Sequence, residues 1–312
     1  MKNLFGLKHF EDDCAESATA RLLELVLRPE VRFVGFGENH WWNNPQRQLV
    51  NQLMGEFWHA GYQHLALEVD LTYQSLLGNF ASGSVTRRQL EVGLRDAAGS
   101  IYDSSGPCPS YFGMIEAARV SGMNLLAVDK DRSQRSWCHP DFAREPRDEF
   151  MAHLITAVLE REPLTKIIFY GGSNHLYRRP AELRQDCGSM AEHIEEYLKP
   201  RGESLFCVGA VLPSDKQCSG LSFAPLYRHC EGLKSVQLIA GNEKLLVNEM
   251  VLGNDRRCPW GGCFDNLSDE CPGVTFDICQ AFTAVPIRAG YWDALMLYPV
   301  TWGKKTYDLA ST

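Results

Sequence analysis

The sequence contains no apolar run long enough to span a membrane. None of its apolar stretches approaches the roughly 18 residues that a transmembrane helix needs. Residues 1–13 lack a sustained apolar core followed by a small-residue cleavage site, so we expect no Sec-type signal peptide. The net charge of −8 provides no basic face for nucleic acid or anionic lipid. We therefore expect a protein of the cytoplasm, or one secreted without a cleaved Sec signal, that binds no nucleic acid.

Several common catalytic motifs are also missing. The chain has no P-loop and no G-x-S-x-G elbow, which argues against an NTPase and a serine hydrolase of the usual kind. It has no H-E-x-x-H, which argues against an ordinary zinc protease. What remains is a chain of ordinary globular composition whose chemistry has to come from another arrangement of side chains.

Cysteine usage does not suggest a disulfide framework. The 11 cysteines are odd in number and scattered, as in proteins that keep their thiols reduced. Four of them lie near the C-terminus, at Cys258, Cys263, Cys271 and Cys279. These four lack the C-x-x-C pairs that zinc sites usually show, so buried or loop thiols are favoured over a structural metal.

Strand-like and helix-like segments alternate over the first two thirds of the chain. The predicted helices are 14–28, 45–61, 110–120, 148–161 and 189–198. The predicted strands are 31–36, 65–69, 124–129, 166–170 and 204–212. Residues 72–107 contain a short helix and the start of a polar loop, 131–147 form a loop at the mouth of the sheet, and 291–298 form a last strand. This alternation predicts an α/β fold with a mostly parallel central sheet flanked by helices.

We expect one domain over residues 1–312. Residues 30–212 would form the strand–helix core that carries the site. Residues 213–312 would form an irregular, cysteine-rich C-terminal extension that returns to the sheet with its final strand.

The candidate site follows from what stands at the carboxyl ends of these strands, because ligands of parallel α/β sheets bind there. The segment 31–40, V-R-F-V-G-F-G-E-N-H, places Glu38 and His40 just after the first strand. Glu68 ends the second strand, and His175 follows G-G-S-N after a later one. Each of the two histidines comes three residues after a glycine, which permits a sharp turn into the crevice. We expect these four side chains to converge.

Other residues at the same ends are candidates for substrate binding, namely Trp41, Trp42, Arg47, Asp70, Asp129 and Asn174. Asp70 and Asp129 are equally well explained as helix caps. The two tryptophans either wall a pocket or pack in the core. Arg47 either holds the site or an oxyanion, or lies on a solvated helix surface.

Two carboxylates and two imidazoles in one crevice support two kinds of chemistry. They can perform acid–base catalysis, in which a histidine activates water and a glutamate orients it. They can also bind a divalent metal through Glu38, His40, Glu68 and His175. The spacing of these residues leaves both readings open.

At this point the motifs resemble a known superfamily. G-E-N-H, L-A-L-E-V-D, G-G-S-N-H-L and the closing run 291–301 are similar to those of erythromycin esterases, ChaN-type haem-binding proteins and the Tiki/TraB metalloproteases. The resemblance implies an α/β fold of the erythromycin esterase/ChaN kind, in which Glu38, His40, Glu68 and His175 match the functional positions. The first motif is G-E-x-H, as in the ChaN type, and the large helical insertions of the macrolide esterases are absent, which argues against macrolides as substrates.

From this resemblance we expect a hydrolase that acts on an ester or amide in a small molecule or peptide. The alternatives are a ChaN-like protein that binds haem or iron, and an effector- or toxin-like bacterial protein that acts on a host partner. The cofactor is left open between none, a divalent metal and, ranked below the metal, haem.

Overall fold

The computed structural model describes residues 13–38, 45–95, 102–103, 106–130, 146–176, 178, 188–211, 237–240 and 293–297. The predicted site residues 40–42, most of the predicted 131–147 loop and the four C-terminal cysteines lie outside these residues. The chain divides into two compact units, residues 27–209 with 290–292, and residues 1–26 with 210–289 and 293–312. That the chain forms a single domain stays a prediction.

A parallel sheet forms the centre of the larger unit. Its strands are β1 (Val31–Glu38), β2 (Tyr62–Asp70), β5 (Asn124–Asp129), β6 (Lys166–Gly172) and β7 (Ser204–Val211). They lie in the order β5-β2-β6-β1-β7, and each neighbouring pair is parallel. β1 and β6 are buried along their whole length, as strands covered on both faces are. The predicted α/β fold with a mostly parallel sheet is confirmed.

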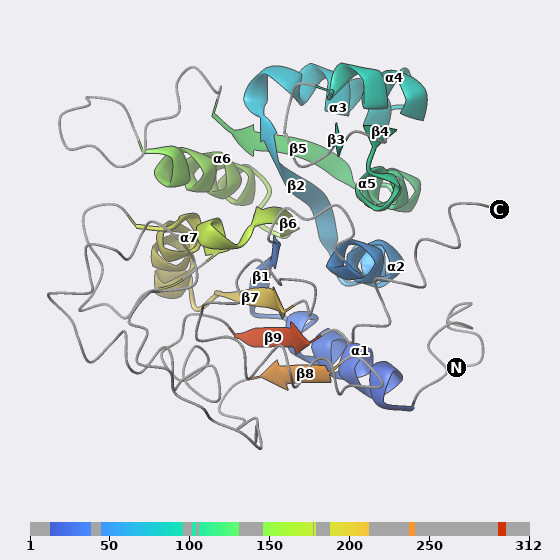
Figure 1. The fold of residues 1–312 in the computed structure, drawn as a ribbon. Coiled ribbons are helices and arrows are strands. Elements are labelled where there is room, and N and C mark those ends of the chain that lie inside the picture. The colour runs from blue at the N-terminus through green and yellow to red at the C-terminus, as the bar shows by residue number, and fades with distance from the viewer. Residues whose placement is uncertain are drawn as a thin grey trace, which may run out of the picture. The chain divides into compact units, whose positions relative to one another are not determined.

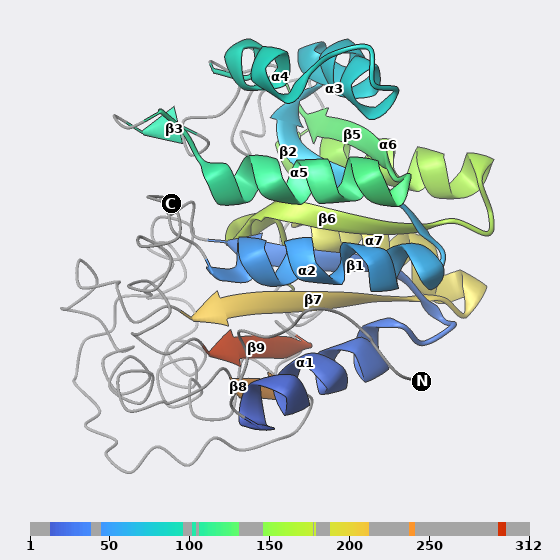
Figure 2. The ribbon, with the colours of Figure 1, turned by 90° about the vertical axis from the view of Figure 1, so that its right-hand side faces the viewer.

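Helices cover both faces of this sheet (Figures 1 and 2). On one face lie α2 (Pro45–His59) and α5 (Pro109–Ser121), which pack against each other. On the other face lie α6 (Arg147–Arg161) and α7 (Met190–Leu198), which also pack together. The short helices α3 (Gln74–Ala81) and α4 (Arg87–Gly93) lie beside β5, the edge strand. No helix among the described residues is long and apolar enough to cross a membrane.

The remaining short elements of this unit connect the main ones. They are η1 (Leu71–Tyr73), the two-residue strands β3 (Tyr102–Asp103) and β4 (Gly106–Pro107), η3 (Ser173–Leu176) and η5 (Lys199–Arg201). Of these, η3 carries a predicted site residue, His175, directly after β6.

Gly35 in β1 determines where η3 packs. A Cβ atom at this position would lie 2.4 Å from Cδ2 of Leu176, which is fully buried. Only glycine therefore leaves room for the Leu176 side chain on the strand. Leu176 follows His175 directly, so this contact holds the segment that carries the histidine against β1.

The amino ends of the strands have polar contacts of their own. Arg32 donates to the carbonyl of Thr165 and forms an ion pair with Glu203. His64, near the start of β2, lies 2.8 Å from Glu162 through its Nε2 atom. This His–Glu pair lies at the amino ends of the strands, whereas the predicted site lies at their carboxyl ends.

In the smaller unit, α1 (Asp13–Val26) packs on β8 (Gln237–Ala240), which pairs antiparallel with β9 (Ala294–Leu297). β9 is the predicted final strand. β8 was not predicted.

Candidate functional site

The two predicted glutamates point to opposite faces of the sheet. Strand register pairs Tyr170 of β6 with Leu67 on one side, and pairs Gly172 with Glu38 on the other. Because side chains alternate along a strand, Glu38 shares the face of Tyr170, whereas Glu68 takes the opposite one. Consistent with this, a Cβ at Gly171 would lie 2.9 Å from the Cβ of Glu68. At the carboxyl ends of the strands there are therefore two acidic centres, one on each face of the sheet.

Glu38 belongs to a buried ion pair beneath α2 and α5. Arg47 donates to both of its carboxylate oxygens, from Nε to Oε2 and from Nη2 to Oε1, each at 2.7 Å. The hydroxyl of Tyr170 donates to Oε2, also at 2.7 Å. The third guanidinium nitrogen lies 3.0 Å from Sγ of Cys108, and the guanidinium lies over the ring of Tyr111.

Burial and the charges of neighbouring side chains determine the protonation of Arg47 and Tyr170. Arg47 is fully buried, and Glu38 is 3% exposed. Burial alone would lower the pKa of Arg47, but the charge and hydrogen bond of Glu38, together with Tyr170 and Cys108, outweigh it and the pKa rises well above the usual value. Burial, followed by the Glu38 charge, raises the pKa of Tyr170 well above its usual value, so its hydroxyl stays a donor. Arg47 thus holds Glu38, and of the two alternatives for this residue the solvated helix surface is excluded; its part in substrate binding stays a prediction.

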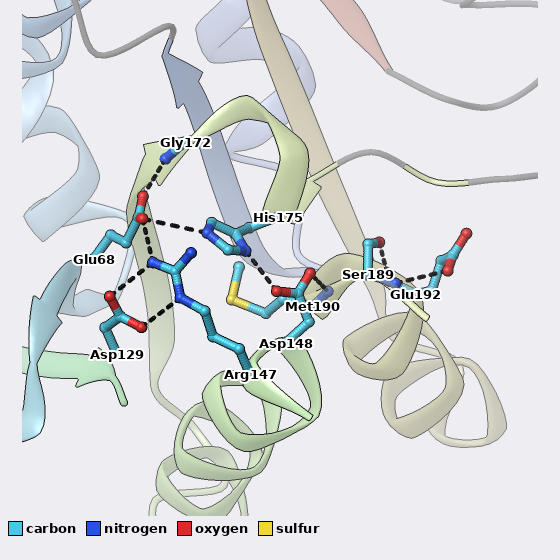
Figure 3. A network of polar contacts seen from close by, with 9 residues as sticks. All are labelled: Glu68, Asp129, Arg147, Asp148, Gly172, His175, Ser189, Met190 and Glu192. Atoms are coloured by element: carbon cyan, nitrogen blue, oxygen red, sulfur yellow. Dashed lines mark hydrogen bonds and ion pairs between the residues drawn. The ribbon is translucent and has the colours of Figure 1, made fainter. Parts of the chain in front are cut away.

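Glu68 is at the centre of a second network, which lies where α6 and α7 begin (Figure 3). Its Oε2 accepts the backbone N–H of Gly172 at 2.6 Å, and its Oε1 accepts Nη2 of Arg147 at 2.5 Å. The Nε2 atom of His175 lies 3.3 Å from the same Oε1. The structure therefore brings together two of the predicted catalytic residues, Glu68 and His175.

His175 is held from both sides. Its Nδ1 lies 2.7 Å from Oδ1 of Asp148, in the first turn of α6. Burial alone would lower the pKa of His175, but the charges of Asp148 and Glu68 outweigh it and raise that pKa to about 10. Burial alone would raise the pKa of Asp148, but the charge and hydrogen bond of His175, the Met190 N–H and the Arg147 charge together lower it. At neutral pH the ring is therefore an imidazolium that donates from both nitrogens.

Arg147 joins this network to the end of β5. Its Nε and Nη2 donate to the two oxygens of Asp129, each at 2.7 Å. Burial lowers the pKa of Arg147, but hydrogen bonding to Asp129 and the charge of Glu68 raise it by more. Asp129 is thus engaged by the arginine that also holds Glu68.

The other predicted residues are placed as follows. Asp70 accepts the backbone N–H and the hydroxyl of Thr72, at 2.9 and 2.8 Å, and so caps η1. Asn174 lies in η3, and its side chain is outside the described part of the structure, as are His40, Trp41 and Trp42. Their proposed parts in the site stay predictions.

Sequence reasoning missed Arg147, Asp148 and Tyr170. It began the helix that corresponds to α6 at residue 148 and assigned 147 to a loop. The available signal was Pro146 followed by the acidic pair Asp148 and Glu149, which marks the first turn of a helix. In a parallel α/β sheet such helix starts lie at the same edge as the strand ends, so their side chains also reach the site.

The donor atoms of these centres do not suit a divalent metal. Both oxygens of Glu38 and both oxygens of Glu68 already accept hydrogen bonds, and each carboxylate faces an arginine. Both ring nitrogens of His175 face carboxylates, Nδ1 that of Asp148 and Nε2 that of Glu68. Within the described ranges, no group of three or more His, Cys, Asp or Glu side chains could hold a metal ion.

The fold and the site define an α/β protein with a charged network at the carboxyl edge of its sheet. When the chain is compared with known proteins, no family model and no curated protein matches it. Similar solved structures include the type III effector HopBA1, which is 13% identical over 62% of this chain and 83% of that chain, with a TM-score of 0.42.

Two further structures have comparable scores. RRSP, a MARTX toxin effector domain from Vibrio vulnificus, is 19% identical over 64% of this chain and 36% of that chain, with a TM-score of 0.42. ChaN of Campylobacter jejuni, which binds haem cofacially, is 14% identical over 62% of this chain and 85% of that chain, with a TM-score of 0.39. The neighbours thus include effector or toxin domains and ChaN, at low identity, and the likeness concerns the fold.

Proposed function

We propose that this chain is a hydrolase of an ester or amide, and that Glu68 and His175 form its acid–base pair. The observation that carries the proposal is their contact. A carboxylate and an imidazolium lie 3.3 Å apart at the carboxyl edge of a parallel sheet, where such folds bind ligands. Their side chains are 12% and 6% exposed, so the pair is sheltered without being sealed from solvent.

The protonation states assign the roles. Glu68 is the anion of the pair and therefore the group that can accept a proton; Arg147 and the N–H of Gly172 hold its carboxylate in place. His175 holds a proton on Nε2 at neutral pH and is the group that can donate one. This assigns water activation to the glutamate, and it gives the histidine the part of a general acid.

The proposed step balances as follows. The water oxygen bonds to the acyl carbon while Glu68 takes a water proton. The bond from that carbon to the leaving oxygen or nitrogen breaks, and the leaving atom takes the Nε2 proton of His175. The products are an acid and an alcohol or amine. Glu68 then returns its proton to Nε2 and restores the resting pair.

Arg147 would support this step through Glu68. Its guanidinium binds Glu68 and Asp129 together, which places the Glu68 carboxylate rigidly beside His175. A preorganised charge of this kind lowers the cost of reorganisation when charge moves in the transition state. His40, which the sequence motif places near this edge, remains a candidate for a further role.

The test is hydrolysis of a panel of p-nitrophenyl esters and fluorogenic peptidyl amides by wild type, Glu68→Gln and His175→Gln. General acid–base groups contribute about 10²–10⁴-fold in rate, so we expect losses of that size in both variants. His64→Gln is the matched control, because it changes a His–Glu pair at the opposite edge of the sheet. Wild-type turnover in a folded His175→Gln protein refutes the proposal.

A further inference from the structure

One carboxylate, that of Asp148, contacts two other segments at the site (Figure 3). The residue itself lies in the first turn of α6. Its Oδ1 faces Nδ1 of His175 at 2.7 Å, and its Oδ2 accepts the backbone N–H of Met190, the first residue of α7, at 3.0 Å. Both oxygens are therefore engaged by donors that belong to different elements.

We infer that Asp148 is a positioning residue for the acid–base pair: it holds the proton of His175 on Nδ1 and so directs Nε2, the reacting nitrogen, toward Glu68. This inference rests on the proposed function of that pair. Asp148 acts through the ring, so it is not itself assigned a catalytic part.

Three observations support this role. The contact from His175 to Asp148 is 2.7 Å, whereas the contact to Glu68 is 3.3 Å, so Nδ1 is the more tightly held nitrogen. The anchor of Asp148 is a backbone N–H, which can donate and never accept. Ser189 and Glu192 form a capping box at the start of α7, which holds the segment carrying that N–H in place.

Because the backbone N–H of Met190 can only donate, the substitution Asp148→Asn should have one defined effect on the tautomer of His175. In Asp148→Asn, the amide has one oxygen for two donors. Met190 can only donate, whereas a neutral His175 can accept at Nδ1. The amide oxygen will therefore face Met190, and its NH₂ group will face the ring. The histidine proton is then expected on Nε2, the opposite tautomer from wild type.

The experiment is ¹⁵N NMR of histidine-labelled protein, with the His175 signal assigned by its loss in His175→Gln. In wild type at high pH we expect the neutral ring to carry its proton on Nδ1, and in Asp148→Asn on Nε2. Glu149→Gln is the matched control, because it removes one negative charge from the same turn at an exposed position. It should leave the wild-type tautomer in place.

Kinetics supply an independent arm. On a substrate identified with the ester and amide panel, Asp148→Asn should lower kcat by about 10²–10⁴-fold and leave KM within about twofold, because without the Asp148 charge the ring is neutral and a far weaker acid than the imidazolium, whereas the substrate is not touched. An unchanged tautomer in folded Asp148→Asn protein overturns the inference, and so does a wild-type ring that carries its proton on Nε2. The wild-type result decides the matter if the variant does not fold.

The two arms separate the two claims. The NMR result needs no substrate, so it tests the positioning of the ring even if no compound of the panel is hydrolysed. Conversely, hydrolysis that depends on His175 but persists in Asp148→Asn supports the proposed function and refutes the positioning role.

Discussion

Deprotonation of His175 at alkaline pH should destabilise this protein. The pKa of its ring is about 10 in the folded protein, against 6.5 for an ordinary histidine. The folded state therefore binds a proton that the unfolded state has released. A raised pKa of this kind gives stability that is fully present below pH 6.5 and is lost as the pH rises through 10.

The magnitude follows from the gap between these two values. Each pKa unit is worth about 1.4 kcal/mol, so the interaction contributes on the order of 5 kcal/mol. The contribution falls by about 1.4 kcal/mol per pH unit inside the window. The lowered pKa of Asp148 reflects the same ion pair, so this contribution is counted once. Against a typical total of about 5–15 kcal/mol, such a loss is easily measured.

Urea unfolding of wild type and His175→Gln at intervals from pH 6 to pH 10 is the assay. Other groups titrate in this range, so the quantity of interest is the difference between the two proteins in free energy of unfolding. We expect wild type to be the more stable at pH 6 and its advantage to shrink steadily toward pH 10. Parallel pH dependences of the two proteins would refute the reasoning.

Three further predictions concern the two acidic centres. Arg47→Met should lower the free energy of unfolding by about 3–5 kcal/mol, because it leaves Glu38 buried without its ion-pair partner; the double variant with Glu38→Gln should recover part of this loss in urea unfolding. Gly171→Ala should cost about 1–3 kcal/mol in the same assay and lower turnover, because the new methyl group would lie 2.5 Å from Cζ of Phe169 and 2.9 Å from the Cβ of Glu68. Arg147→Met should reduce hydrolysis of the ester and amide panel at least tenfold, because Glu68 loses the cation that holds it in place. Circular dichroism should show unchanged secondary structure. Full activity in this variant would exclude the supporting role of Arg147.

Much of the fold could be predicted because the strands of the parallel sheet are buried on both faces. Such strands appear in the sequence as short apolar runs, and the strand 124–129 was found residue for residue. The four-residue strand β8 was missed because so short a segment shows no measurable period. The helix start at Arg147 was misplaced by one residue, within the usual uncertainty of helix ends.

The site was predicted in part. The rule that polar residues follow strand ends located Glu68 and His175, which the structure brings together. It could not show that Glu38 and Glu68 point to opposite faces. That depends on the register between β1, β6 and β2, which no single strand encodes. It also missed Asp148, since first-turn acids usually serve the helix itself.

The charge on His175 at neutral pH is the point on which the roles of the acid–base pair depend. It can be measured directly from the ¹⁵N signals of the ring at pH 8, assigned by comparison with His175→Gln. We expect an imidazolium, with both ring nitrogens protonated, because Asp148 and Glu68 raise the pKa of the ring to about 10. A neutral ring at pH 8 would contradict the assignment of His175 as the acid and would return it to the role of a base.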